Sequence, residues 1–460
     1  MKHSPKRVIW LIPATAYALL LWRTMYGFKS LPIRVLDWVT LAGVLVAWAI
    51  VRWKRGAQWP RTPLNGPLLA WCATAALAAA FSINPRNSLL AVWQIWTWAI
   101  VLWALVDALR RGWGGALWKA LFLVGGIVCL ISGMELLSWY FGWPLVPGSS
   151  QGWLSIGGLA HPFPPTLHRL SIALANATAL SAFIALLIPP AIATLVATQQ
   201  QDHRKGIGLW LVAALTVEFL SMSRGGWLAL ITSLPFLGLG AIFSPQFRQW
   251  WSRLPLVRGK LLALFSFATV FIFILSAGYT LIVQIRGIDV TGTLRALSGE
   301  DVARDSVRID MWRSALAIFT DRPLTGVGPS AYGTGLRLYR QPLLARDQFA
   351  AAHNLYLNVL AEMGVPGLLA GAAFLVTLAW TWWRQWRAAT PGSATWWRLL
   401  GVGAALIGLG TQSMVDTFLE SGIILPTLFF FATILTPAIP MRIAQPSAGR
   451  WRWALAIAVV

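Results

Sequence analysis

The chain has 460 residues, of which 57% are hydrophobic and only 11% are charged, and its mean hydropathy is +0.65. Ordinary globular proteins carry about 25% charged residues, so this composition excludes a soluble enzyme and predicts an all-α, polytopic membrane protein. The formal net charge of +22 would suggest nucleic acid as a partner of a soluble chain. Here membrane topology explains most of that charge, and we expect the bilayer, not nucleic acid, as the partner.

About 20 apolar residues are needed for one helical crossing of a bilayer. By this criterion the sequence predicts twelve spans, with a cytoplasmic N-terminus, at 8–22, 35–51, 64–81, 88–109, 117–140, 170–196, 207–222, 226–243, 261–284, 356–382, 399–419 and 421–440. The seventh and eighth spans are separated only by Ser223–Gly226, which predicts a tight hairpin with Arg224 at its tip. Residues 441–460 are expected to form a basic cytoplasmic tail and the start of a truncated further helix.

Lysine and arginine are distributed asymmetrically over the loops between these spans. The segments predicted to be cytoplasmic carry 22 of them, and the short loops on the other side carry 6. Because cytoplasmic loops are enriched in cations, this ratio predicts that residues 285–352 lie on the external side of the membrane. The predicted organisation is spans one to nine in 1–284, a long external loop in 285–352, and spans ten to twelve in 353–440.

The long external loop is rich in arginine and contains no lysine. Its nine arginines are Arg286, Arg295, Arg304, Arg308, Arg313, Arg322, Arg337, Arg340 and Arg346. A guanidinium offers paired donors in a fixed fork that suits phosphate oxygens, so this loop predicts an anionic, membrane-borne substrate. Apolar residues at helical spacing predict a helix near 306–320 within the loop.

Acidic residues inside the predicted spans gather toward one side. Glu135, Glu218, Glu362, Asp416 and Glu420 all fall in the outer halves of their spans. Ionisable groups within a membrane are costly and are usually paired or functional, so this distribution predicts a polar site that opens toward the outer leaflet. A proton or ion relay would need charges distributed through the membrane, which disfavours a transporter.

The start of the tenth span combines a histidine with a polar ridge. Asn354, Asn358 and Glu362 recur at positions i, i+4 and i+8, so they share one helix face, and His353 lies at its outer end. The ridge is equally consistent with a hydrogen-bonded helix contact. His353 at the water boundary is placed to exchange protons with a substrate.

Three stretches in this order resemble a known family. They are Ser223-Arg224-Gly225-Gly226-Trp227, the segment 306–329 that ends in Thr325-Gly326-Val327-Gly328-Pro329, and the segment 353–368 from His353-Asn354 to Glu362-Met363-Gly364-Val365-Pro366-Gly367-Leu368. Together with the twelve spans and the large external loop, they resemble the O-antigen ligase and O-antigen polymerase superfamily of bacterial membrane glycosyltransferases.

The resemblance implies an activity. It implies a metal-independent, inverting transfer of a glycan from an undecaprenyl-diphosphate-linked donor to a hydroxyl of a glycan, lipid or protein acceptor, at the periplasmic face and without a cofactor. Matched residue by residue, Arg224 and Arg308 correspond to positions that hold the diphosphate, and His353 corresponds to the catalytic histidine. Glu362 is a catalytic candidate together with His353, and Glu362 or Asp310 is a candidate to orient His353. The supporting candidates are Arg304, Arg313, Asp310, Asn176, Asn354 and Asn358.

Other interpretations of these residues stay open from the sequence. Arg224 is also consistent with a solvated hairpin tip, and Arg308 with a solvated helix face. O-antigen ligation is favoured, because the large loop between spans nine and ten resembles that branch. A polymerase, a protein O-glycosyltransferase, a lipid-linked-glycan transporter without chemistry and a structural membrane component are the alternatives.

Overall fold

The computed structural model describes residues 31–54, 56, 59–141, 169–171, 174, 176–245, 248–249, 252, 300–339, 349–417 and 423–436. Within these ranges the regular elements are helical and no strand occurs, which confirms the all-α prediction for this part of the chain. The predicted spans 8–22 and 261–284, Glu420 and the tail 441–460 lie outside the described residues.

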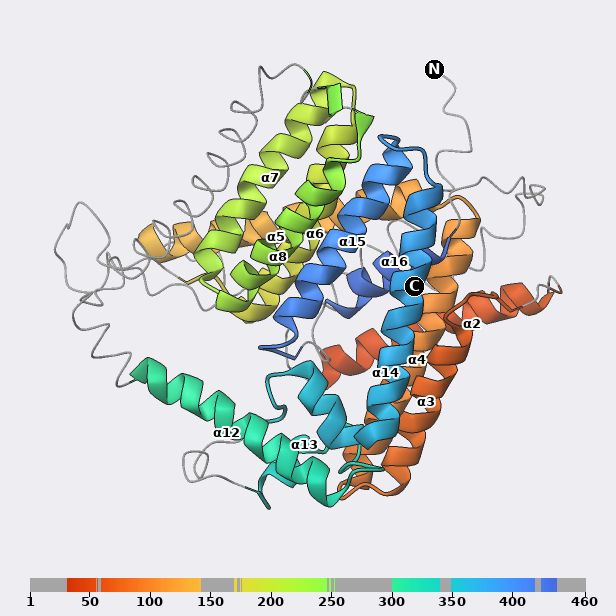
Figure 1. The fold of residues 1–460 in the computed structure, drawn as a ribbon, viewed down its shortest axis with the longest axis vertical. Coiled ribbons are helices and arrows are strands. Elements are labelled where there is room, and N and C mark those ends of the chain that lie inside the picture. The colour runs from red at the N-terminus through yellow and green to blue at the C-terminus, as the bar shows by residue number, and fades with distance from the viewer. Residues whose placement is uncertain are drawn as a thin grey trace.

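The helices follow one another as a bundle with two helices of the long loop at one end (Figure 1). They are α2 (Leu31–Lys54), α3 (Asn65–Ala80), α4 (Pro85–Arg110), α5 (Gly114–Phe141), α6 (Ala177–Ala197), α7 (Gln201–Ser221), α8 (Arg224–Ala241), α12 (Glu300–Asp321), α13 (Tyr332–Leu336), α14 (Leu355–Ala388), α15 (Ala394–Gln412) and α16 (Ile424–Leu435).

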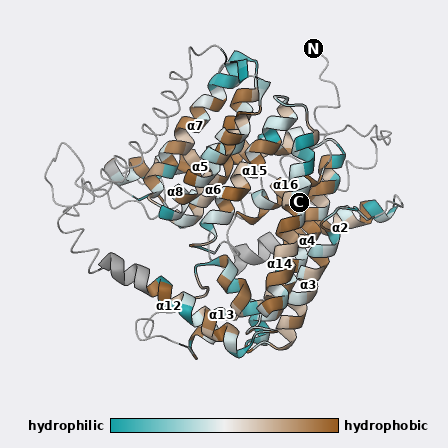
Figure 2. Cartoon of the chain, in the orientation of Figure 1, coloured by the Kyte–Doolittle hydropathy of each residue, from teal (hydrophilic) through white to brown (hydrophobic). Residues whose placement is uncertain are grey.

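The structure supports a membrane protein but does not confirm twelve crossings. Among the described residues, four helices are long and apolar enough to span a bilayer, namely α4, α5, α6 and α14. The apolar helices α3 and α16 are shorter, and α16 supplies 12 helical residues within the described part of the predicted span 421–440. Apolar residues cover most of the bundle helices, and hydrophilic residues concentrate toward several helix ends (Figure 2).

Helices α6, α8 and α15 form the tightly packed centre. A side chain at Gly401 of α15 would meet Ala193 of α6 at 2.8 Å, and one at Gly408 would meet the Ala229 carbonyl of α8 at 2.8 Å. Small residues let membrane helices approach closely, so these glycines set the spacing of α15. Helix α7 also packs against α6, while α14 packs against α3 and α16 against α4.

The predicted hairpin between the seventh and eighth spans is confirmed. Only Met222 and Ser223 join α7 to α8, and Met222 adopts the left-handed conformation with φ 49°. The Ser223 hydroxyl caps α8 by accepting a hydrogen bond from Gly226 N at 3.4 Å. Arg224 therefore stands in the first turn of α8, at the end of the bundle.

Helix α14 is broken near its start, where the sequence predicted one continuous span over 356–382. Gly364 has φ 63° and ψ −161°, which interrupts the helix. The backbone groups that the break releases bond to the long loop: Val365 N donates to Pro323 O at 2.8 Å, and Gly328 N donates to Glu362 O at 3.0 Å. Non-helical backbone at such a depth is stable when neighbouring protein satisfies it.

The long loop contains the predicted helix near 306–320, which extends over the whole of α12. One face of α12, with Met311 and Ile318, packs against Tyr332 of α13 in a small core of its own. The segment after α12 also bonds to the α3–α4 turn: Ile83 N donates to Val327 O at 3.1 Å, and Ser88 Oγ donates to Pro329 O at 2.8 Å. The loop and this turn thus lie at the same end of the bundle.

Candidate active site

His353 lies two residues before the start of α14, in a backbone conformation that residues other than glycine rarely adopt. Its φ is 49°, in the left-handed region, which costs energy for a residue other than glycine. The backbone on either side is fixed: Ala352 N donates to Asn358 Oδ1 at 3.0 Å, and Leu355 N donates to Ser413 O at 2.8 Å. Strained residues persist where their surroundings determine their conformation, and they are frequent at functional sites.

Asp416, after α15, is the carboxylate beside this histidine. His353 Nδ1 lies 3.1 Å from Asp416 Oδ1, which also accepts a hydrogen bond from Thr417 N at 3.0 Å. The Asp416 side chain is 11% exposed and that of His353 is 38% exposed. In the tautomer in which Nδ1 donates to Asp416, Nε2 is an acceptor, so a buried carboxylate orients a solvent-accessible base.

This pairing corrects the expectation that Glu362 or Asp310 orients His353. Among the described residues, the carboxylate bonded to His353 is Asp416, which is 63 positions away in sequence. Sequence reasoning noted Asp416 only as one of several acids near the outer ends of spans. No local spacing signals a partnership between residues on different helices.

The Ser223–Gly226 turn presents Arg224 at the surface because its two glycines are pressed into the bundle. Arg224 is exposed, whereas Gly225 and Gly226 are buried. A side chain at Gly226 would overlap the Ser181 hydroxyl of α6 and the Glu218 carboxylate of α7. The glycines therefore seat the first turn of α8 on two neighbouring helices, and this seating fixes the base of the Arg224 side chain.

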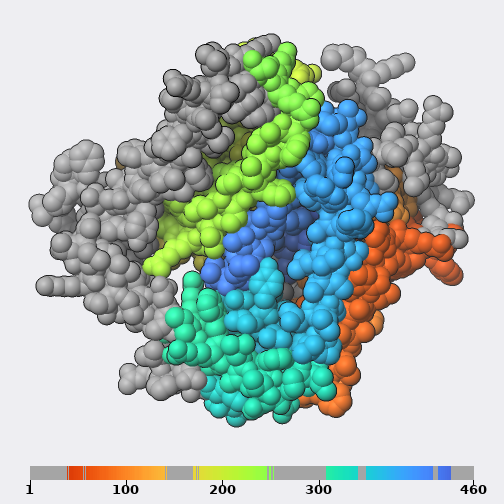
Figure 3. Space-filling model, viewed as in Figure 1, coloured from red at the N-terminus to blue at the C-terminus, as the bar shows by residue number. Residues whose placement is uncertain are grey.

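The C-terminal end of α15 connects this arginine turn to the histidine. A side chain at Gly225 would meet Gln412 Cγ at 3.1 Å, so the last residue of α15 lies against the first turn of α8. The next residue, Ser413, accepts the hydrogen bond from Leu355 N, and Asp416 holds His353. In Figure 3 the start of α14, the end of α15 and α8 adjoin on one face. Three helix ends thus place the turn that carries Arg224 and the segment that carries His353 at the same end of the bundle.

Other polar residues lie at the same end of the bundle. Arg169 Nε donates to Ser221 O, the residue that ends α7, at 3.0 Å. Ser171 N donates to the buried Glu135 carboxylate of α5 at 3.0 Å. Asn176 caps α6 with its side chain and is exposed. The Ser181 hydroxyl of α6 donates to Glu218 Oε1 at 2.6 Å. The outer-half acids within the described residues therefore share one end of the bundle.

The arginines of α12 have no described contact with Arg224 or His353. Arg308 is half-buried on α12, and the described contacts join it to neither Arg224 nor His353. Asp310 is buried and pairs with Arg313 across 3.4 Å, and the Arg313 side chain is 68% exposed. Arg304 lies one helical turn before Arg308, so the two share a face of α12; the Arg304 side chain lies outside the described atoms.

The residues of the predicted polar ridge at the start of α14 accept hydrogen bonds from backbone N–H groups. The side chain of Asn354 caps α14 by accepting from Leu357 N at 3.0 Å, and Asn358 holds the backbone before His353. Glu362 is 5% exposed and accepts a hydrogen bond from Tyr332 N at 3.1 Å. Of the three residues, Asn354 therefore caps its own helix, whereas Asn358 and Glu362 bind backbone N–H groups outside α14.

Tyr332 completes the attachment of the loop to α14. Its hydroxyl donates to Met311 O at 2.8 Å, which links α13 to α12. Burial, followed by the charge of Glu362, raises the pKa of the Tyr332 hydroxyl above its usual range. The hydroxyl therefore remains a hydrogen-bond donor throughout the physiological pH range, and the loop keeps its attachment.

The middle of the chain matches a known protein family. Residues 208–372, roughly a third of the chain, match the family described as O-antigen ligase. The match contains Arg224, Arg308, His353 and Glu362, whereas Asp416 lies beyond it. A search of curated proteins found no match. Within the described residues, no group of three or more His, Cys, Asp or Glu side chains is arranged to hold a metal ion.

Proposed function

The chain belongs to the O-antigen ligase-like superfamily, whose members are glycosyltransferase-like enzymes, and from this premise we propose a specific reaction. The protein transfers a glycan from an undecaprenyl-diphosphate-linked donor to an acceptor hydroxyl at the outer face of a bacterial inner membrane. The observation that carries the proposal is His353, whose backbone is strained and whose side chain is bound by Asp416. The end of α15 lies between this residue and the turn that carries the exposed Arg224, at one end of the bundle.

The proposed reaction is a single displacement that inverts the anomeric carbon. The acceptor oxygen forms a bond to that carbon, and the bond from the carbon to the phosphate oxygen breaks, with its electron pair leaving on the diphosphate. His353 Nε2 takes the proton of the attacking hydroxyl. A positioned general base typically contributes about 10²–10⁴-fold to such a rate.

Arginine side chains stabilise the leaving group in this scheme. Arg224, and Arg308 from the long loop, bind the diphosphate oxygens and stabilise the charge that develops on them. Fixed charges aimed at a developing anion are often the largest single catalytic contribution, and guanidinium forks match the geometry of phosphate. We therefore propose that the reaction requires neither a metal ion nor another cofactor.

Asp416 and Glu362 have different roles in the proposal. Asp416 is a positioning residue, because it bonds His353 and leaves Nε2 free to face the acceptor. Glu362 was a catalytic candidate from the sequence. Its bond to Tyr332 N and its 5% exposure support a role in anchoring the loop over the site. Arg304, Arg313 and Asp310 are proposed to support the loop helix that carries Arg308.

The test uses the purified full-length chain with a polyprenyl-diphosphate-linked glycan, a chelator, and acceptors offered one at a time. We expect turnover in the presence of the chelator. His353→Ala should bind donor as wild type does but lose about 10²–10⁴-fold in product formation. His203→Ala is the matched control, since His203 is exposed at the start of α7, and it should retain full activity.

Two results would contradict the proposal. One is product formation by His353→Ala at the wild-type rate. The other is movement of the lipid-linked glycan across a bilayer without any product, which is what a transporter would give. The acceptor that yields product decides between ligation to a lipid A–core, which we favour, and polymerisation or protein glycosylation.

A further inference from the structure

A second cluster of arginines lies at the end of the bundle opposite the candidate active site. Helix α4 starts at Pro85, beside the turn that the long loop contacts, and ends at Arg110. With a rise of 1.5 Å per residue, its 26 residues separate the two ends by about 39 Å. The cluster joins the end of α4, the end of α2 and the segment 59–64 between α2 and α3.

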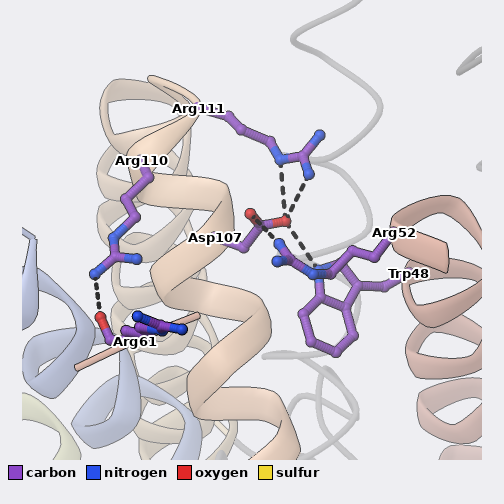
Figure 4. A network of polar contacts seen from close by, with 6 residues as sticks. All are labelled: Trp48, Arg52, Arg61, Asp107, Arg110 and Arg111. Carbon is purple, nitrogen blue, oxygen red and sulfur yellow. Dashed lines mark hydrogen bonds and ion pairs between the residues drawn. The ribbon is translucent and has the colours of Figure 1, made fainter. Parts of the chain in front are cut away.

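Asp107 forms the fixed centre of this cluster (Figure 4). Its carboxylate accepts hydrogen bonds from Arg52 Nη1 at 2.6 Å, from Arg111 Nε at 3.0 Å and from Trp48 Nε1 at 3.0 Å. Asp107 is 8% exposed, so this network joins α2 to α4 away from water. One carboxylate thus compensates part of the charge of two arginines, and their role is to hold the helices together.

Arg61 and Arg110 extend the cluster toward the surface. Arg110 Nη2 donates to Arg61 O at 2.7 Å, and Arg110 Nε is buried without a hydrogen-bond partner in the described structure. Trp59 fixes the segment, because its ring lies 5.6 Å from that of Trp48 and 5.0 Å from that of Trp103. Arg61 and Arg110 thus lie outside the Asp107 network, and no described carboxylate forms an ion pair with either of them.

We propose that this basic patch, formed by Arg61 and Arg110 beside the Asp107 network, binds the phosphate headgroup of an anionic phospholipid. The positive charge complements a phosphate, and guanidinium groups bind phosphate oxygens in pairs. Trp59, which is 49% exposed, and Trp53, which is 81% exposed, flank the patch. Tryptophan favours the membrane–water interface, and basic pockets between helix ends recognise lipid headgroups there. A soluble anion would make no contact that requires the exposed indole rings of Trp53 and Trp59, whereas a lipid would.

The experiment compares phosphatidylglycerol, phosphatidylcholine and inorganic phosphate as ligands of the purified full-length protein. Bound lipid is counted by native mass spectrometry, and thermal stabilisation is measured in parallel. Wild type should bind phosphatidylglycerol in preference to the other two. Arg61→Gln/Arg110→Gln should weaken that binding about 30-fold, as expected from the loss of two surface cations. The control Arg204→Gln/Lys205→Gln removes two exposed cations from α7 and should change it less than threefold.

Several outcomes would overturn the proposal. They are equal binding of phosphatidylcholine by wild type, equal stabilisation by inorganic phosphate, or unchanged phosphatidylglycerol binding by Arg61→Gln/Arg110→Gln. If that double variant does not fold, Arg61→Lys/Arg110→Lys keeps both charges but loses the guanidinium fork, and it should bind several-fold more weakly than wild type. Wild-type affinity in this variant would contradict a site built on guanidinium groups. No assay uses a glycan donor, so the outcome is independent of the proposed function.

Discussion

At His353 the backbone and the side chain are held by different parts of the chain. Asn358 and Ser413 fix the backbone on either side, and Asp416 binds the imidazole. A histidine that accepts a proton must keep one orientation as it does so, and these bonds from other segments hold it in that orientation. The geometry is the same as that by which a buried acid orients a catalytic histidine in other enzymes.

We predict that Asp416→Asn lowers kcat by about tenfold or more without changing the KM for the donor, because the base is misoriented while the diphosphate site is intact. Rates of glycan transfer at saturating donor measure this effect. The matched control is Asp321→Asn, which removes a carboxylate bonded to Tyr339 at the far end of α12 and should keep the wild-type kcat.

A double variant tests whether Asp416 acts through the histidine. If it does, Asp416→Asn/His353→Ala should be no slower than His353→Ala alone, because the supporting bond has nothing left to orient. Independent, multiplicative losses would instead show that Asp416 contributes by another route.

Helix α8 depends on two glycines at its start. We predict that Gly226→Ala destabilises the protein by about 1–3 kcal/mol, since the new methyl group overlaps Ser181 and Glu218 and forces α8 away from α6 and α7. Thermal unfolding of purified protein measures the loss. Gly238→Ala in the same helix meets nothing within 4 Å and should leave the unfolding temperature unchanged or slightly higher. Equal effects of the two variants would contradict this account of the turn.

Helix α14 is divided by Gly364, whose φ of 63° suits glycine. Gly364→Ala places a methyl group against the Pro323 carbonyl, so we predict that the loop segment 322–336 detaches. Limited proteolysis should then cut this segment faster than in wild type, and transfer activity should fall. Gly133→Ala in α5 meets nothing within 4 Å and serves as the control. An unchanged cleavage pattern in Gly364→Ala would show that the loop does not depend on the break.

At the scale of the whole molecule, the proposed function requires the His353 end to face the exterior. Ala350→Cys and Met414→Cys are exposed at that end, and Arg204→Cys is exposed at the start of α7. We predict that a membrane-impermeant thiol reagent labels the first two in intact cells and the third only after permeabilisation. Cys72 and Cys129 are buried and give a low background. The reverse labelling pattern would place the site in the cytoplasm and contradict the proposed reaction.

Much of this architecture could be predicted from composition and local pattern. Hydropathy gave the all-helical membrane class, the Ser223–Gly226 interruption gave the α7–α8 hairpin, and apolar spacing gave α12. These features depend on residues close together in sequence, so local physics determines them. The number of crossings stays a prediction, since the described residues include four helices that are long and apolar enough to span a bilayer and exclude two of the predicted spans.

The sequence by itself determined that the chain is a membrane protein with a basic loop, and it singled out Arg224 and His353 as residues to examine. Only the tertiary structure decided that Asp416 supports His353, that Glu362 anchors the loop, and that α14 breaks at Gly364. Each of these features joins groups from segments distant in sequence. Hydrogen bonding in a buried site depends on which groups lie within about 3 Å, and the packing of whole helices sets that proximity.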